Sequence, residues 1–164
     1  MVRRVFPAFL IVWPGLAMAN DYPTPNTLLW GAVGEPWLVS AKAEGRLGDS
    51  FTGQVGFGGL GLDATLGFDW AFRWRPDALC VGCGQRDLLT VGVGPGGLVM
   101  PPVNWDDWRF AAGGDLGLAY VHWLSPQAGL TIAAHGGAGA AWVDLDVSAL
   151  SLQWWGFVGM GMAF

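Results

Sequence analysis

A pair of cysteines has the spacing of a metal-binding or redox site. Cys80 and Cys83 are separated by two residues, so the pair could bind a metal, exchange disulfides or form a local disulfide. A redox pair needs a helix start in a βαβ context, which the flanking sequence does not predict. A structural zinc needs two further ligands, and His122 and His135 lie far away along the chain. In an exported protein the spacing favours a disulfide that closes the loop 76–87, and we assign no metal or cofactor.

His122 and His135 are the candidates for a catalytic base. His122 precedes Ser125 by three positions, and on a strand this spacing places the two side chains on opposite faces. The positions two residues after His122 and His135 are Leu124 and Gly137, so neither histidine has a following hydroxyl partner on its own face. We therefore predict no catalytic residues and lean against an enzymatic role.

The segments that must position these residues alternate between apolar and polar side chains. From Leu60 to Arg75 nearly every second residue is large and apolar, and the charged residues all fall on the other face. A helix would scatter these charges around its circumference, whereas a strand directs them to one side. The same pattern predicts strands at Thr27–Val33 (the weakest), Trp37–Leu47, Phe51–Phe57, Arg86–Gly94, Trp108–Tyr120, Leu130–Trp142 and Leu150–Phe164.

The amino-terminal segment has the pattern of a secretory signal peptide. Arg3 and Arg4 precede an apolar run, and the small residues of Ala17-Met18-Ala19 predict cleavage before Asn20. Two prolines interrupt the run, which is also too short for a spanning helix. We expect residues 1–19 to be removed and residues 20–164 to form a single β-barrel domain.

The composition of the chain further limits the classes of protein to which it can belong. The chain is 52% hydrophobic, yet past residue 19 no apolar stretch reaches the length of a transmembrane helix. The chain has 8 basic and 13 acidic residues. Removal of Arg3 and Arg4 with the signal peptide leaves 6 basic residues, so the formal net charge becomes 6 − 13 = −7. This balance, with no basic cluster, argues against a nucleic-acid partner.

The carboxy-terminal strand supplies the family resemblance. Its apolar face runs from Leu150 through Trp154 and Val158 to the aromatic terminal residue Phe164. In this feature and in its alternating strands the chain resembles small bacterial outer-membrane β-barrels. The resemblance implies a closed antiparallel up-and-down transmembrane β-barrel of eight strands with its termini in the periplasm. It also implies contact with outer-membrane lipid and lipopolysaccharide, and recognition of Phe164 by the barrel assembly machinery.

In such a barrel the polar faces point inward, because lipid covers the outside. We expect an interior network of four bases and four acids with one histidine: Lys42, Glu44, Arg46, Asp63, Asp69, Arg73, Arg109, Asp115 and His135. Paired charges are tolerated where isolated ones are not, so this interior should be closed rather than conducting. Tryptophans near strand ends, including Trp70 and Trp123, are expected at the membrane interfaces.

The leading hypothesis is an outer-membrane barrel with a filled lumen and a structural or surface-interaction role. One alternative is a lipid-modifying enzyme similar to the lipid A deacylases, which are eight-stranded barrels with a His/Ser pair on one strand. The other is a soluble periplasmic lipocalin-like barrel that carries a ligand. A soluble barrel would have a polar exterior and an apolar lumen, the reverse of the membrane arrangement.

Overall fold

The structure, a computed structural model, describes residues 23–59, 66–76, 79–80, 86–102, 107–144 and 146–164. The expected signal peptide lies outside these residues. The described part is all-β, with strands β1 (Thr27–Glu35), β2 (Val39–Arg46), β3 (Phe51–Gly59), β4 (Gly67–Trp74), β5 (Leu79–Cys80), β6 (Asp87–Met100), β7 (Arg109–Ser125), β8 (Ala128–Val143) and β9 (Asp146–Ala163). None of the described residues forms a helix long and apolar enough to span a bilayer.

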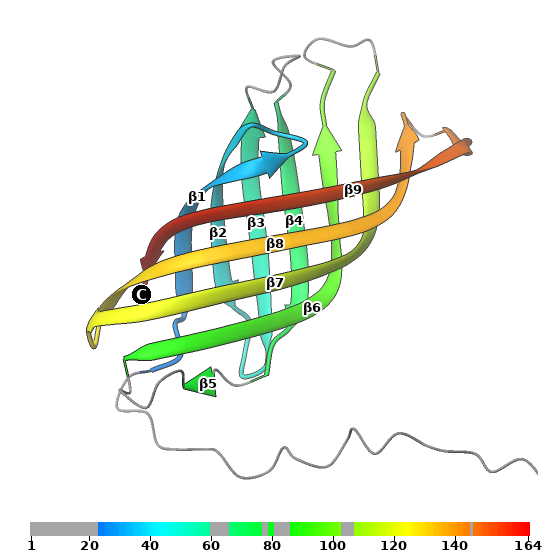
Figure 1. The fold of residues 1–164 in the computed structure, drawn as a ribbon. Coiled ribbons are helices and arrows are strands. Elements are labelled where there is room, and N and C mark those ends of the chain that lie inside the picture. The colour runs from blue at the N-terminus through cyan, green and yellow to red at the C-terminus, as the bar shows by residue number, and fades with distance from the viewer. Residues whose placement is uncertain (1–22, 60–65, 77–78, 81–85, 103–106, 145) are drawn as a thin grey trace, which may run out of the picture.

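Eight of these strands form a closed antiparallel barrel (Figure 1). The short β5 pairs only with the beginning of β6. Each other strand pairs with its neighbours along the chain, β4 pairs with β6, and β1 pairs with β9 to close the wall. The predicted eight-stranded up-and-down architecture is therefore confirmed. Because the wall is closed, every barrel strand is paired on both sides over part of its length, although β9 pairs with β1 only from Gly156 onward.

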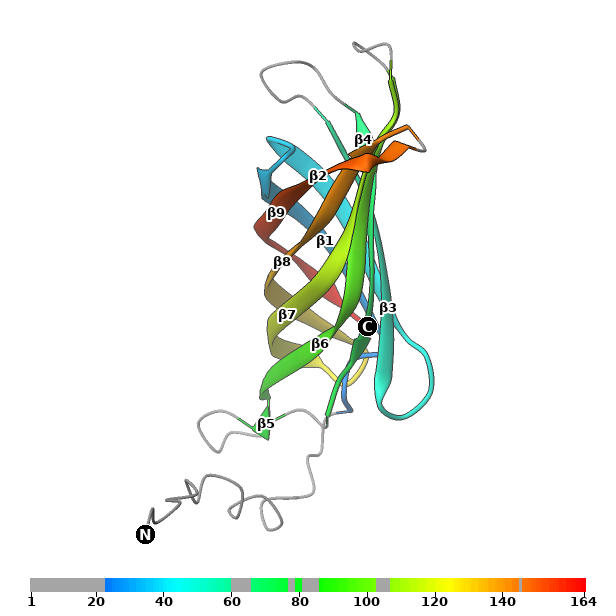
Figure 2. The ribbon, with the colours of Figure 1, turned by 90° about the vertical axis from the view of Figure 1, so that its right-hand side faces the viewer.

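The chain enters and leaves the barrel at the same end. The carbonyl oxygen of Phe164 accepts hydrogen bonds from the main-chain nitrogens of Asn26 and Thr27, at 2.7 and 3.1 Å. The turns 47–50 and 126–127 are at this end too, and Figures 1 and 2 show it at the bottom. We call it the terminal end. β1, β3, β6 and β8 end at the opposite end, where β2, β4, β7 and β9 begin.

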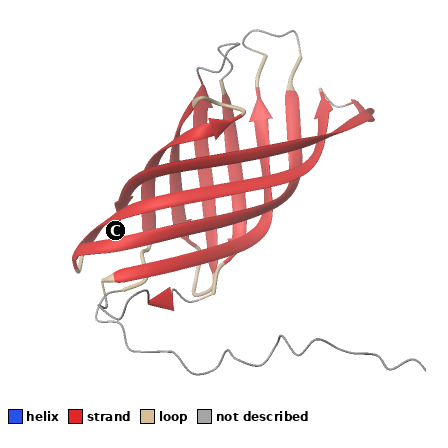
Figure 3. Cartoon of the chain, viewed as in Figure 1, coloured by secondary structure: helices blue, strands red, loops and turns tan. Residues whose placement is uncertain are grey.

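The strands differ in length around the barrel. β1 to β4 have 8 or 9 residues each, whereas β6 to β9 have 14 to 18. Figure 3 shows the long strands crossing the barrel with a strong tilt. The alternation predicts a long strand at 60–75. The described strand β4 begins at Gly67, and residues 60–65 lie outside the described part.

The strand predicted at Arg86–Gly94 is longer than expected. β6 continues through Pro95 to Met100 and stays paired with β7 along its whole length. On its other side the ladder to β4 is interrupted, because Ala71 pairs with Gly96 and Trp74 with Val93 but no pair lies between them. A proline has no N–H to donate, so it is accommodated where one ladder is already broken.

The two faces of the wall differ as the alternation predicts. Each of the eight barrel strands exposes large apolar side chains on the outside, among them Leu29, Val39, Val55, Phe68, Val93, Leu118, Ile132 and Met160. Charged and polar side chains of the same strands are buried inside, together with an apolar set that includes Leu28, Leu88, Leu98 and Phe157.

Candidate functional site

The centre of the barrel holds a network of buried charges. Lys42 on β2 forms an ion pair with Asp69 on β4, with 2.5 Å between Nζ and Oδ1. Gln54, on β3 between them, donates from Nε2 to the other carboxylate oxygen of Asp69 at 2.8 Å. Both oxygens of Asp69 thus have a partner, which a buried carboxylate requires.

A second ion pair crosses the lumen beside the first. Arg73 on β4 donates from Nε to Oδ1 of Asp115 on β7 at 2.6 Å, and its Nη2 lies 2.5 Å from the same oxygen. The Nη1 atom of Arg73 donates to Gln54 Oε1 at 3.0 Å and to Glu44 Oε2 at 3.2 Å. Gln54 therefore links the two ion pairs, since its amide group contacts Asp69 on one side and Arg73 on the other.

His135 on β8 completes the network. Its Nδ1 lies 3.2 Å from Asp115 Oδ2, and its Nε2 lies 3.2 Å from Gln54 Nε2 and 3.5 Å from Asp69 Oδ2. Trp155 Nε1 donates to the same Asp115 oxygen at 2.8 Å. Aromatic rings surround this region: Phe157 stacks on His135 with centroids 5.0 Å apart, and Lys42 Nζ lies 3.4 Å from the centre of the Phe157 ring.

Glycines on the inward faces make room for these long side chains. A Cβ added at Gly56 would lie 1.9 Å from Asp69 Oδ1, and one at Gly117 would lie 2.8 Å from the Arg73 guanidinium carbon. The inward glycines thus provide part of the volume that the charged side chains occupy.

The network is close-packed rather than solvated. Lys42, Asp69, Arg73, Asp115 and His135 are each 1–5% exposed. A side chain lining a channel wide enough for water would be much more exposed. Eight strands enclose an interior that side chains can fill, and here they do so over the described residues.

The structure brings together six of the nine residues expected in this network: Lys42, Glu44, Asp69, Arg73, Asp115 and His135. Arg46 lies at the terminal end, where its Nη2 donates to the main-chain oxygen of Asp49 at 2.5 Å. Arg109 is exposed at the start of β7, at the opposite end, so it lies outside the buried network although it is on the same face of β7 as Asp115. Asp63 lies outside the described residues.

Gln54 and Arg75 also belong to the network, although neither was predicted there. Both belong to inward faces that the alternation identified, but Gln54 has no charge and Arg75 lies just beyond the end of β4. Arg75 Nη1 donates to Glu44 Oε1 at 3.1 Å, so Glu44 joins Arg73 to Arg75. An inventory of every polar residue on the inward faces, charged or not, would have found both.

Apolar side chains lie in the interior towards each end. Trp37 is fully buried next to Gly58 and Gly67, near the end opposite the termini. Trp123, Val121 and Leu88 are fully buried near the terminal end. The expectation that Trp123 lies at a membrane interface was wrong. Trp123 and Asp115 are both odd-numbered residues of β7, and the odd-numbered residues of this strand point inward. Trp70 is exposed on the outer wall, but it lies in the middle of β4, paired with Val55, and not at a strand end.

The residues considered for catalysis lie apart from one another. His122 is on the outer wall, where Asp87 Oδ1 lies 2.7 Å from its Nδ1 and accepts a hydrogen bond from Tyr120 Oη at 2.6 Å. The Ser125 hydroxyl oxygen instead accepts from the main-chain nitrogens of Gln127 and Ala128 in the β7–β8 turn. Among the contacts of the described residues, none joins His122 to Ser125.

Only one of the two cysteines of the predicted disulfide is among the residues that the structure describes. Cys80 ends β5, and Cys83 lies outside the described residues, so the pairing stays a prediction. Over the described ranges no group of three or more His, Cys, Asp or Glu side chains is placed to hold a metal ion.

Comparison of the chain with protein-family models, with curated proteins and with solved structures finds no match.

Proposed function

We propose that this chain is an integral outer-membrane β-barrel protein with a side-chain-filled interior and a structural or surface-interaction role. The observation that carries the proposal is the apolar outer wall of a closed barrel. Every barrel strand contributes exposed large hydrophobic residues to this wall, and Val55, in the middle of β3, is 64% exposed. The termini would lie in the periplasm, and the connections at the other end would face outward.

The physical basis of the proposal is that an apolar outer wall is stable in lipid and unfavourable in water. A water-soluble monomer rarely exposes a continuous apolar surface around its whole circumference. A bilayer suits that surface, provided that no main-chain hydrogen-bonding group is left unpaired in the hydrocarbon. The closed ladder from β1 round to β9 pairs most of these groups, apart from an interruption between β4 and β6 and the part of β9 before Gly156, which has no partner in β1.

The soluble alternative has less support. A lipocalin-like carrier would place charged residues outside and a ligand cavity inside. In this chain the charged residues Lys42, Asp69, Arg73 and Asp115 are buried, whereas Phe68, Trp70 and Val158 are exposed. The lipid-modifying alternative also has less support, because the Ser125 hydroxyl is used in a turn and His122 pairs with Asp87.

A structural role is favoured over transport by the packing of the interior. Three bases (Lys42, Arg73, Arg75) balance three acids (Glu44, Asp69, Asp115) in mutual contact. Moving a solute through this region would break ion pairs that are buried and hydrogen-bonded, and each broken pair would leave an uncompensated charge. Interaction with partners would then rest with the connections at the outward end.

The test is partition between membrane and water. Cells expressing the chain are subjected to osmotic shock, and the membranes are then washed with alkaline carbonate and extracted with detergent. We expect the protein to resist the shock and the wash and to be released only by detergent. Release by osmotic shock alone would contradict the proposal. Mass spectrometry of lipid A from cells with and without the protein tests the enzymatic alternative, and we expect identical profiles.

A further inference from the structure

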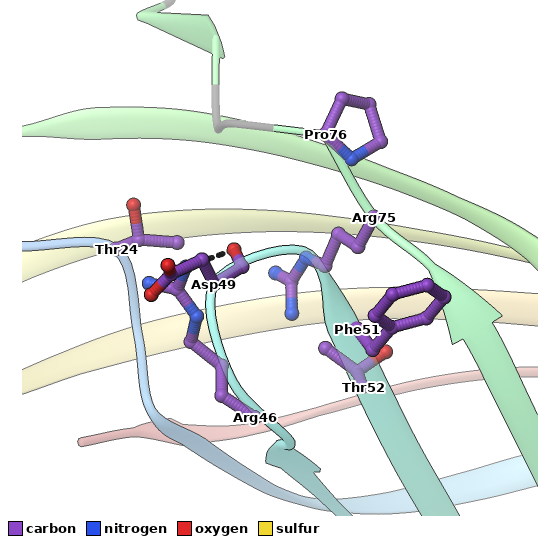
Figure 4. Close-up of a pocket in the computed structure, with 7 residues that line it drawn as sticks. All are labelled: Thr24, Arg46, Asp49, Phe51, Thr52, Arg75 and Pro76. Atoms are coloured by element: carbon purple, nitrogen blue, oxygen red, sulfur yellow. Dashed lines mark hydrogen bonds between the residues drawn. The ribbon is translucent and has the colours of Figure 1, made fainter.

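The two ends of the barrel differ in how completely the main chain is paired. At the terminal end, the nitrogen of Arg75 donates to the main-chain oxygen of Ser50 at 2.7 Å, which ties the end of β4 to the β2–β3 turn. Figure 4 shows the side chains at this end, where Arg46 Nη2 donates to the Asp49 main-chain oxygen. The seven residues drawn there pack too closely to admit a ligand. A strand edge without a partner lies instead at the opposite end, on β9.

β9 continues past the end of β1. The pairing with β1 stops at Glu35, which lies opposite Gly156. On its other side β9 stays paired with β8 in unbroken register from Ala163 to Ser151. Figure 1 shows β1 ending part of the way along β9. Over the described residues, the segment from Ser151 to Trp155 therefore has a strand partner on one side only.

The register of β9 shows which main-chain groups of this segment face the open edge. The nitrogen of Thr27 donates to the Phe164 oxygen at 3.1 Å, and the nitrogen of Phe164 donates to the Thr27 oxygen at 2.9 Å. Phe164 therefore directs both its N–H and its C=O towards β1. In an antiparallel ladder this direction alternates from residue to residue. The even-numbered residues of β9 thus face β1 as far as Gly156, and beyond it the N–H and C=O groups of Trp154 and Leu152 face the open edge.

A side chain of the same strand already binds one of these groups. Gln153 Nε2 donates to the main-chain oxygen of Trp154 at 2.9 Å, so this oxygen accepts a hydrogen bond on the side away from β8. Among the contacts of the described residues, none pairs the N–H of Trp154 or either main-chain group of Leu152. An open strand edge is a template for another strand, and in the hydrocarbon of a bilayer each unpaired group is costly. The edge is therefore suited to receive a further strand.

The side chains beside the open edge indicate which sequence would fit it. Leu152 is 82% exposed and Trp154 is 61% exposed, both on the outer wall. Side chains directly opposite each other on antiparallel strands lie on the same face, so an added strand should place apolar residues beside these two. Exposed acidic residues flank the segment: Glu35 at the end of β1 and Asp146 at the start of β9. A matching strand would therefore have basic residues at its ends.

We propose that the open edge of β9 binds an extended segment of a partner polypeptide, which adds a strand antiparallel to β9 and in line with β1. The main-chain groups of Leu152 and Trp154 form its hydrogen bonds, and the added strand displaces the Gln153 amide from the Trp154 oxygen. Its outer face is apolar, its inner face has small polar residues beside Ser151 and Gln153, and its ends are basic. In strand addition, main-chain bonds give the affinity and alternate side chains give the specificity.

A second copy of this chain is the other polypeptide that could pair with the edge. Two copies joined antiparallel by these edges are related by a twofold axis perpendicular to the wall, and this axis inverts one barrel relative to the other. Barrels inserted in one outer membrane share an orientation, so the pairing is not available to them. This exclusion rests on the proposed function, whereas the open edge itself does not.

The experiment is titration of a fluorescent synthetic peptide with the full chain, folded in micelles of an uncharged maltoside detergent and followed by fluorescence anisotropy. The peptide has the sequence KVTVTVK, which places its valines on one face and lysines at its ends. We expect saturable binding, together with slower amide hydrogen exchange at Leu152 and Trp154. The same peptide with N-methylated valines keeps its side chains but lacks the N–H groups that face the edge, and it should not bind.

Variants of β9 separate the main chain from the side chains. Leu152→Pro removes an N–H that faces the open edge and leaves the ladder to β8 intact, so it should weaken binding about tenfold or more. Leu152→Ala keeps that N–H and should weaken binding less. Met160→Ala is the matched control, because Met160 is 73% exposed on the same strand but lies opposite Gly31 of β1, and it should leave binding unchanged.

The proposal is overturned if the peptide does not bind, if the N-methylated peptide binds equally well, or if Leu152→Pro binds as the unaltered chain does. Light scattering tests the choice of partner. A dimer of the chain alone that Leu152→Pro separates would assign the edge to a second copy and overturn the proposal. Membrane partition of the same preparation tests the proposed function separately.

Discussion

Arg73 and Asp115 form an ion pair across the barrel interior although their strands are not neighbours. β6 lies between β4 and β7, and the pair spans it with both Nε and Nη2 of Arg73 close to one carboxylate oxygen. Glycines permit this approach: a Cβ at Gly96 would lie 2.7 Å from the Asp115 Cβ, and one at Gly117 would lie against the guanidinium group. The ion pair thus links β4 and β7, two strands that are not joined directly by main-chain hydrogen bonds.

Removal of one partner of this ion pair should be strongly destabilising. Arg73→Met leaves Asp115 buried without its cation, and we expect the free energy of unfolding to fall by about 3–5 kcal/mol. The measurement is urea unfolding of the protein in micelles or vesicles. The double variant Arg73→Met with Asp115→Asn should lose less than the sum of the two single losses, because the residues interact directly. Strict additivity would contradict the contact.

The inward glycines should be sensitive to a single added methyl group. Gly56→Ala would place a Cβ against Asp69, and the Asp69 side chain cannot move away freely because Lys42 and Gln54 hold it. Overpacking of this kind costs about 1–3 kcal/mol, measured in the same unfolding experiment. Gly31→Ala is the control: a Cβ there meets nothing within 4 Å, so it should be neutral or slightly stabilising. Equal effects of the two substitutions would count against the packed interior.

A charge on the outer wall distinguishes lipid from water as its surroundings. Val55→Arg lies in the middle of β3, and on a lipid-facing wall it should cost about 2–4 kcal/mol of unfolding free energy in vesicles. Leu47→Arg, in the exposed turn at the terminal end, should cost at most about 1 kcal/mol. If water surrounded the wall, both substitutions would be nearly neutral. A neutral Val55→Arg would therefore argue against the membrane proposal.

The packed interior predicts an absence of conductance. In planar bilayers the purified protein should give no regular current steps, because the charged residues at its centre are paired and almost fully buried. A general porin, which has a water-filled lumen, serves as the positive control. Reproducible single-channel steps from this chain alone would show that the interior opens, and the proposed structural role would then be untenable.

Much of the fold was predictable because it depends on a local property. Side chains of a strand alternate between its two faces, so the inward direction of Lys42, Gln54, Asp69 and Asp115 follows from their positions in the sequence. The ends of the strands were less predictable. The pattern predicts a strand that ends at Gly94, but β6 continues past Pro95 because a break in the ladder to β4 accommodates its missing N–H.

The amino-acid sequence by itself determined the number of barrel strands and which side chains face inward, since both depend on a period of two and on the turns between strands. Only the tertiary structure decided which charges meet. The pairing of Arg73 with Asp115 and the bridging position of Gln54 depend on the relative register of strands far apart in the chain. Closure of the barrel between β4 and β6 and between β1 and β9 sets that register, and no local pattern encodes it.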